Sequence, residues 1–286
     1  MKVLRKIIKW IFLLGVLGIA GYIVAENYLY EQKIQHEITR FRQHSSITYQ
    51  QINYNDILNL PAPVQRYLKF AVRDGKRYPN TISLVHGGWY RMSADQSWMS
   101  IYGEEYYRLD KPEYLWFSKI SYPPGILIRA RDSYFAGVGK KSMDVLSVYP
   151  LMHRSDQATS VTNLLRYLFE MPNIPMAFYR SNFLSWQAID DHSARVTIKD
   201  GDIQASATFY FDADGKLVRA ITNDRYRKTR AGLVKTPMVV RYGDYKYVDG
   251  YFVPGFREMA WKIPSGEYIY ARYMLDRVDG TRVSSR

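Results

Sequence analysis

Arg166 and Glu170, one helical turn apart, are the first candidates for chemistry in this sequence. They lie in the stretch LLRYLFEMPNIP, residues 164–175, which has the pattern of a short helix stopped by Pro172 and Pro175. On a helical wheel the neighbouring side chains form an apolar arc of about 200°, so this pair shares the narrow remainder. A carboxylate and a guanidinium at this spacing can serve as an acid–base group and an anion holder, or can simply pair with each other.

Two interpretations of this pair stay open at the level of sequence. In the first, a buried helix keeps an ion pair at its only polar edge, which would contribute roughly 0.3 kcal/mol. In the second, the pair faces the open mouth of a curved sheet and belongs to a site.

Two further charged residues, Asp132 and Arg225, stand beside residues of opposite charge, in Arg131-Asp132 and Asp224-Arg225. Neighbours in a strand point to opposite faces of a sheet, so one member of each pair can point inward. An inward charge needs a partner. We therefore expect salt bridges among Asp132, Glu170, Arg166 and Arg225, forming a polar cluster inside an apolar interior.

The familiar catalytic motifs are missing from the sequence. It contains no GxSxG, SxxK, HExxH, GxGxxG or GxxxxGK[ST] pattern, and His86, His153 and His192 are isolated. There is no cysteine, which excludes disulfides, thiolate metal sites and cysteine nucleophiles together. We expect no metal and no cofactor, and leave open whether the protein is an enzyme.

The N-terminus carries the strongest single signal. Lys2, Arg5, Lys6 and Lys9 precede a mostly apolar run, and residues 7–25 are long enough to cross a lipid bilayer. The run is longer than the core of a typical cleaved signal peptide and lacks a good cleavage site, so an uncleaved anchor is favoured over a signal peptide. The positive-inside rule places the N-terminus in the cytoplasm and the remainder outside.

This pattern predicts a single-pass protein of the cell (inner) membrane with three parts. Residues 1–25 form a basic tip and transmembrane anchor, residues 26–59 a helical stalk or linker, and residues 60–286 an extracytoplasmic β-rich domain. Within the stalk, Ile34, Ile38 and Phe41 form one narrow apolar stripe. The chain has 40 Lys and Arg against 27 Asp and Glu, a net charge of +13, but its location outside the cytoplasm argues against nucleic acid as a partner.

After residue 78 the apolar pattern changes from helical spacing to alternation. Stretches rich in aromatic and β-branched residues follow one another, separated by turns such as Asp200-Gly201 and Asp249-Gly250. About eleven antiparallel strands, interrupted by one helix at 161–171, predict an α+β fold that is mainly antiparallel β. The expected shape is a curved sheet or half-barrel that wraps one or two helices.

Several stretches resemble an uncharacterised family of bacterial membrane-anchored proteins of unknown function. The resemblance covers most of residues 60–273 and rests on LPAPVQRYLKFA, RDSYFAGVGK, LLRYLFEMPNIPMAF, FDADGKLVRAITNDRYR, GDYKYVDGYFVPGFREMAW and GEYIYARY. The residues that match the family pattern are Arg66, Asp132, Arg166, Glu170, Trp186, Arg225, Tyr245 and Trp261. By analogy, the family's shape is similar to the lipoprotein-carrier (LolA-like) half-barrel, in which a curved sheet wraps helices around an apolar cavity. The resemblance implies no catalytic role for any of these residues.

These features favour a binding protein. We expect a membrane-anchored envelope protein that holds a hydrophobic or amphipathic, lipid-like or anionic ligand in a half-barrel cavity. The residues expected at the ligand are Asp132, Arg166, Glu170, Trp116, Trp186, Arg225, Tyr245 and Trp261. Two alternatives remain: a cofactor-free enzyme that uses Glu170 or Asp132 with Arg166 or Arg225, and a structural or sensory envelope protein with a filled core and no ligand.

Overall fold

The computed structural model describes residues 2–44, 48–122, 125–179 and 181–279. Residues 45–47 of the predicted stalk and residues 280–286 of the predicted domain lie outside the described residues. The described chain forms three α-helices and three short 3-10 helices: α1 (Lys2–His44), α2 (Ala62–Ala71), α3 (Gln157–Glu170), η1 (Tyr54–Ile57), η2 (Met171–Asn173) and η3 (Pro175–Phe178).

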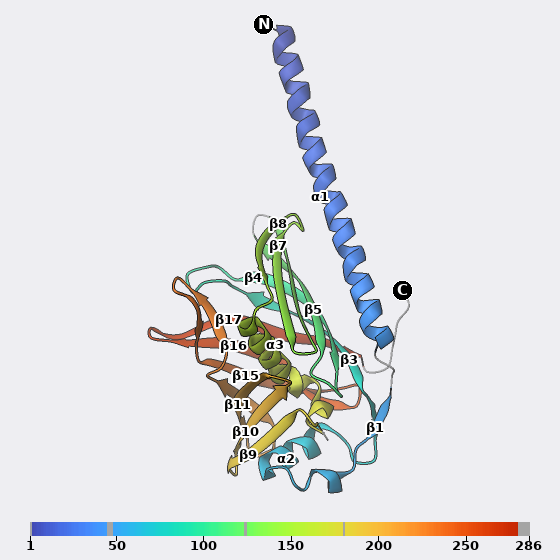
Figure 1. Cartoon of the computed structure of the whole chain (residues 1–286), viewed down its shortest axis with the longest axis vertical. Helices are drawn as coiled ribbons and strands as arrows, with labels where there is room; N and C mark the ends of the chain where they lie inside the picture. The colour runs from blue at the N-terminus through green and yellow to red at the C-terminus, as the bar shows by residue number, and fades with distance from the viewer. Residues whose placement is uncertain (1, 45–47, 123–124, 180, 280–286) are drawn as a thin grey trace.

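A single 13-stranded antiparallel sheet dominates the fold, in the order β8-β7-β6-β5-β4-β3-β17-β16-β15-β12-β11-β10-β9. Its strands are β3 (Thr81–Tyr90), β4 (Met99–Arg108), β5 (Tyr114–Tyr122), β6 (Ile126–Phe135), β7 (Val138–Val145), β8 (Tyr149–Arg154), β9 (Leu184–Asp190), β10 (Ser193–Asp200), β11 (Ile203–Phe211), β12 (Leu217–Thr222), β15 (Met238–Val248), β16 (Tyr251–Ile263) and β17 (Gly266–Asp279). Figure 1 shows this sheet curving around α3. The predicted fold class, a mainly antiparallel curved sheet with a helix inside, is confirmed.

Two small strand pairs stand apart from the main sheet. β1 (Tyr49–Gln51) pairs with β2 (Arg77–Pro79), and β13 (Tyr226–Thr229) pairs with β14 (Gly232–Lys235). The strand count exceeds the predicted eleven partly because the stretch LVRAITNDRYR, expected as one strand, bends after Thr222 and divides into β12 and β13. This bend also directs Arg225 toward the interior.

Helix α3 lies in the middle of the core and contacts both halves of the sheet, β6 and β7 on one side and β10 and β11 on the other. Asp156 caps its first turn by accepting a hydrogen bond from the Thr159 amide at 2.7 Å. Pro172 and Pro175 then break the helix into η2 and η3, as the sequence predicts. The helix approaches β7 closely at Gly139, where an added Cβ would lie 2.6 Å from the Cα of Ser160.

Helix α1 runs out of the globular body, as Figure 1 shows, and is long and apolar enough to cross a membrane. Its C-terminal part packs on the outer face of β4 and β5 through Ile34, Ile38 and Phe41, the stripe that the sequence predicts. Ion pairs flank this contact: Glu31 with Arg129 at 2.7 Å and Glu37 with Arg131 at 2.7 Å. The lower half of α1 is therefore fixed to the domain by both apolar and charged contacts.

Candidate functional site

Arg166 and Glu170 on α3 are both buried, with 5 % and 1 % of their surfaces exposed. The Arg166 guanidinium lies 3.9 Å from Glu170 and, through Nη1, 3.6 Å from Oδ2 of Asp132 on β6. The helix is buried and its two charges keep an ion-pair contact, as the first interpretation expects, but both side chains point into the interior and meet further charges there. Three of the four charges expected to cluster lie together, and Arg166 stands between the two carboxylates.

Glu105 on β4 is a fourth buried charge at this cluster, one not expected from the sequence. Its Oε1 lies 3.4 Å from Arg166 Nη2 and 3.8 Å from Arg257 Nη2, and the Tyr107 hydroxyl donates to its Oε2. Burial alone would raise the pKa of Glu105, but Arg166, His86 and Arg257 outweigh it and hold that pKa well below its usual value. Glu105 is thus a stable carboxylate at neutral pH.

His86 and Trp116 complete the side of the cluster nearest β3. The Trp116 indole N–H donates to His86 Nε2 at 2.9 Å, and the Arg166 guanidinium lies 4.1 Å from the centre of the indole ring. The same His86 Nε2 lies 3.0 Å from Glu105. Burial lowers the pKa of His86 although Glu105 opposes the shift, so the imidazole is neutral at pH 7.

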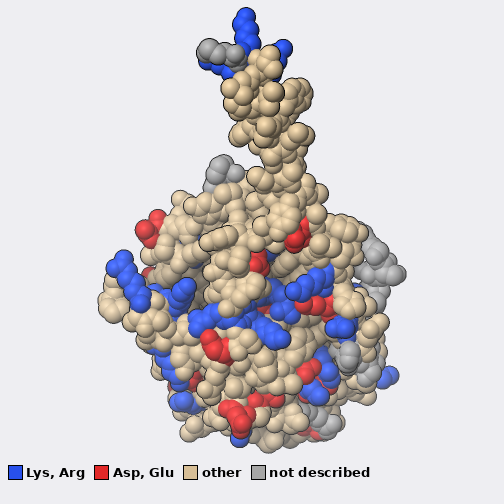
Figure 2. Space-filling model, turned by 45° about the horizontal axis from the view of Figure 1, so that its top comes forward, with Lys and Arg blue, Asp and Glu red and all other residues tan. Residues whose placement is uncertain are grey.

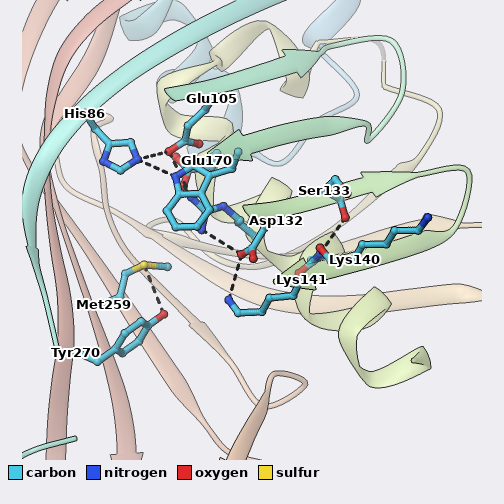
Figure 3. Close-up of polar contacts among 12 residues, drawn as sticks. His86, Glu105, Asp132, Ser133, Lys140, Lys141, Glu170, Met259 and Tyr270 are labelled. Atoms are coloured by element: carbon cyan, nitrogen blue, oxygen red, sulfur yellow. Dashed lines mark hydrogen bonds and ion pairs between the residues drawn. The ribbon is translucent and has the colours of Figure 1, made fainter. Parts of the chain in front are cut away.

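Two more cations balance the remaining carboxylates. Lys141 on β7 pairs with Asp132 at 3.2 Å, and Arg257 on β16 pairs with Glu170 at the end of α3. Figure 3 shows Lys141 reaching toward Asp132 and His86 reaching toward Glu105. Glu105, Glu170 and Asp132 are thus matched by three cations: Arg166, Arg257 and Lys141.

The sequence does contain a pattern from which a buried Glu105 could have been predicted. Glu104 and Glu105 are neighbours in a strand, so they point to opposite faces and one of them has to point inward. The same argument led to Asp132. Arg257 carried the same signal in Arg257-Glu258, neighbours of opposite charge within one strand. Lys141 lies directly opposite Asp132 across the β6–β7 hairpin, a pairing that depends on strand register and that composition alone does not give.

A cavity of about 240 Å³ adjoins this cluster, and Arg166 and Trp116 line both. Its apolar wall comes from methionine and aromatic side chains, including Met143, Met259 and Trp261. The β13–β14 hairpin contributes Tyr226, Arg227, Lys228 and Leu233 to the lining, as does α3 with Ala158, Thr159 and Thr162. The main sheet, the core helix and a separate hairpin therefore all contribute walls to the cavity.

The charged residues that line the cavity all have the same sign. Among the described residues, seven cations line it and no Asp or Glu does. Arg91 donates to the carbonyls of Ile269 and Ala94, and Arg154 pairs with Asp156 at 2.8 Å. Figure 2 shows Lys and Arg gathered in a band on one face of the body, in keeping with the basic net charge. A site with this lining attracts anions.

The structure separates the remaining candidates into two groups. Arg225 and Trp261 line the cavity with Trp116 and Arg166, and the Arg225 guanidinium lies 5.7 Å from the Trp261 ring. Trp186 instead stacks on Phe178 at 5.6 Å, and the Tyr245 hydroxyl donates to the Leu217 carbonyl at 2.8 Å. Neither Trp186 nor Tyr245 lines the cavity. Asp132 and Glu170 lie behind Arg166 and do not line it either.

A second hollow, of about 590 Å³, lies between α1 and the outer face of the sheet. Four of its charged residues form two ion pairs, Arg131 with Glu37 at 2.7 Å and Arg108 with Glu113 at 3.2 Å, and Arg40 and Lys111 line it as well. Unlike the basic cavity, this hollow has two carboxylates among the described residues of its lining, and both are paired with arginines. Within the described part of the chain, no group of three or more His, Asp or Glu is placed to hold a metal ion.

A protein-family model matches residues 50–273, described as a family of unknown function, DUF6544. The chain belongs to this DUF6544 family. The membership confirms the resemblance to a family of unknown function found in the sequence. A comparison with curated proteins gives no match.

The solved structures similar to this chain share little sequence with it. A LolA superfamily protein from Nitrosomonas europaea is 10% identical with a TM-score of 0.41, covering 78% of this chain and 95% of that one. An outer membrane lipoprotein-sorting protein domain from Vibrio parahaemolyticus is 13% identical with a TM-score of 0.41, covering 72% and 88%. A DUF1329 family protein from Desulfovibrio piger is 10% identical with a TM-score of 0.42, covering 72% and 88%.

Proposed function

We propose that this DUF6544 protein is anchored in the cell membrane by residues 7–25 and binds an amphipathic, lipid-like ligand in the cavity beside α3. The observation that carries the proposal is the composition of the cavity wall. Apolar side chains such as Met259 and Trp261 stand beside cations such as Arg166 and Arg225, without an acidic residue among the described lining. Such a wall matches a ligand with an apolar part and a negative group.

The cavity volume limits what part of the ligand is enclosed. At about 240 Å³ the cavity is somewhat smaller than a typical pocket for a drug-sized ligand, about 300–1,000 Å³. This is room for a headgroup and part of one chain, and too little for a whole two-chain lipid. The rest of the ligand would extend past the β13–β14 hairpin.

Contacts at the base of the proposed membrane span support access to the bilayer. Asn27 follows the apolar run, and its side chain donates to the Leu146 carbonyl at 3.0 Å and accepts from Ser147 at 3.1 Å. The β7–β8 connection therefore lies at the level where α1 would leave the membrane. Beside it, Tyr149 and Leu151 are exposed, while Met152 on the same strand lines the cavity.

The alternative functions have less support. The enzyme alternative needs Glu170 or Asp132 in contact with its substrate, whereas both lie behind Arg166 and do not line the cavity. The neighbouring Glu105 has a lowered pKa and stays ionised. A purely structural role predicts a filled interior, and the cavity argues against it.

The test is native mass spectrometry of the full-length chain in a mild detergent, followed by solvent extraction of whatever it retains. Ala158→Trp fills the cavity from α3, and Ala188→Trp, on the exposed edge strand β9, is the matched control. We expect a lipid-like adduct on the wild type and on Ala188→Trp, and its loss from Ala158→Trp. Equal adducts on all three proteins would contradict binding in this cavity.

A further inference from the structure

Arg225 differs from the other buried charges because it has no counter-charge within 4.0 Å in the part of the chain that the structure describes. Its exposed fraction is 6 %, yet its Nε and Nη1 have no hydrogen-bond partner among the described residues. Arg166, Arg257 and Lys141 each pair with a carboxylate of the cluster. A buried charge without a partner is costly, so an arginine kept in this state indicates a role outside the fold's own stability.

The neighbouring acid, Asp224, is held away from Arg225. Its carboxylate accepts from the Ser206 amide at 2.9 Å and pairs with Lys235 at 3.3 Å. On the other side, the Arg225 carbonyl accepts the Thr236 amide at 2.9 Å. These contacts hold the backbone in place between β12 and β13, and from there the Arg225 side chain lines the cavity.

Arg227, two residues further on, repeats the pattern. It lines the cavity from the β13–β14 hairpin, and its Nε also lacks a hydrogen-bond partner among the described residues. Burial and the nearby Arg225 and Arg166 lower the pKa of Lys141, although Asp132 opposes them. The field at this end of the cavity is therefore positive, with two guanidinium groups still free to donate.

We infer that Arg225 and Arg227 bind the phosphate group of an amphiphile, with its apolar part lying against Trp261 and Met259. A phosphate presents several acceptor oxygens, and the planar guanidinium fork matches them bidentately. Trp261 lies where the phosphate-binding and apolar parts of the site meet. The Arg225 guanidinium is 5.7 Å from its ring, and the ring also lines the apolar wall. This inference rests on the proposed function and specifies its ligand class.

The experiment is isothermal titration of the full-length chain in dodecyl maltoside with three probes: hexyl phosphate, hexanol and inorganic phosphate. The variants are Arg225→Met, Arg225→Lys and Arg219→Met, the last removing an exposed arginine of β12 as control. We expect hexyl phosphate to bind the wild type at least tenfold more tightly than either other probe. Arg225→Met should lose this preference, Arg225→Lys should keep part of it, and Arg219→Met should match the wild type.

A thermal melt separates lost binding from lost folding. Because the Arg225 charge has no partner, Arg225→Met should melt at the same temperature as the wild type or higher. Unchanged binding of hexyl phosphate to a folded Arg225→Met would overturn the inference. Equal binding of hexyl phosphate and hexanol, both lost in Ala158→Trp, would overturn the phosphate site and leave the proposed function standing. If inorganic phosphate bound as tightly as hexyl phosphate, the apolar part would add nothing to binding. That result would overturn the inference that the ligand is an amphiphile, and it would count against the proposed function.

Discussion

Glu170, the last residue of α3, forms a buried ion pair with Arg257 in the middle of β16. Both side chains are almost fully buried, and Arg257 also lies near Glu105. The contact ties the core helix to the half of the sheet opposite β7. It therefore sets the position of Arg166, one turn earlier on the same helix, relative to the cavity.

Breaking this pair should destabilise the protein strongly. Either Glu170→Gln or Arg257→Met leaves a buried charge without its partner, and we expect a loss of about 3–5 kcal/mol in the free energy of unfolding. The double variant should lose less than the sum, because it removes both charges. Urea denaturation followed by circular dichroism measures all three.

The matched control for this pair is Arg241→Gln, which breaks a half-exposed pair with Glu267 on the same sheet. We expect that change to cost below about 1 kcal/mol. A Glu170→Gln protein as stable as Arg241→Gln would contradict the structural role given to the buried pair.

Local patterns predicted the elements, and contacts between distant segments decided the site. The apolar arc and the two prolines defined the helix at 161–171, close to the observed α3. Strict alternation of buried and exposed residues along β17 breaks at Tyr270, where a register shift against β16 leaves Tyr270 and Ala271 both buried. A bulge of this kind depends on the partner strand, so residues on one strand do not reveal it.

A site residue was predictable where its immediate neighbours in the sequence already show that a charge must point inward. Asp132 stood out because an adjacent arginine forces one of the two inward. Arg257 stands beside Glu258 in the same way, but only the folded sheet shows that its partner is Glu170. The cavity depends likewise on the β13–β14 hairpin, whose separation from β12 no local pattern indicated.

Acid should destabilise the protein in two steps. The pKa of buried His86 is lowered, so its contribution is complete above the ordinary value of about 6.5 and falls as the unfolded chain takes up a proton. The pKa of Glu105 is lowered too, so its contribution falls below about pH 4.3. Each group should lower the free energy of unfolding by about 1.4 kcal/mol per pH unit within its range.

Urea midpoints measured between pH 8 and pH 3.5 check these two steps. His86→Gln should flatten the upper step and Glu105→Gln the lower one. His192→Gln, on an exposed turn, is the control and should keep the wild-type profile. If the stability of His86→Gln fell with pH in parallel with that of the wild type, titration of the His86 imidazole would not be the cause of the upper step.

Close approach of α3 to β7 should make Gly139 sensitive to a single methyl group. Its amide donates to Ser160 Oγ at 2.9 Å, and an added Cβ would lie 2.6 Å from the Ser160 backbone, which has little freedom to move. We expect Gly139→Ala to lower the free energy of unfolding by about 1–3 kcal/mol. In Gly87→Ala on β3 the new Cβ would meet nothing nearer than 3.9 Å, so that variant should be neutral or slightly stabilised. Similar losses in both would mean that the contact with α3 is not what requires glycine at position 139.

The β7–β8 connection should touch the bilayer if residues 7–25 span it. Asn27 fixes this connection to α1 just beyond the apolar run, and Tyr149 beside it is 66 % exposed. Because the chain has no cysteine, one engineered thiol can carry a nitroxide label without other changes. In the full-length protein in lipid vesicles, a label at Tyr149→Cys should collide more with oxygen than with a water-soluble nickel complex. A label at Ile189→Cys, exposed on the opposite edge strand β9, should show the reverse. Water-like accessibility at both positions would mean that the domain stands clear of the membrane, and that the cavity cannot take its ligand directly from the bilayer surface.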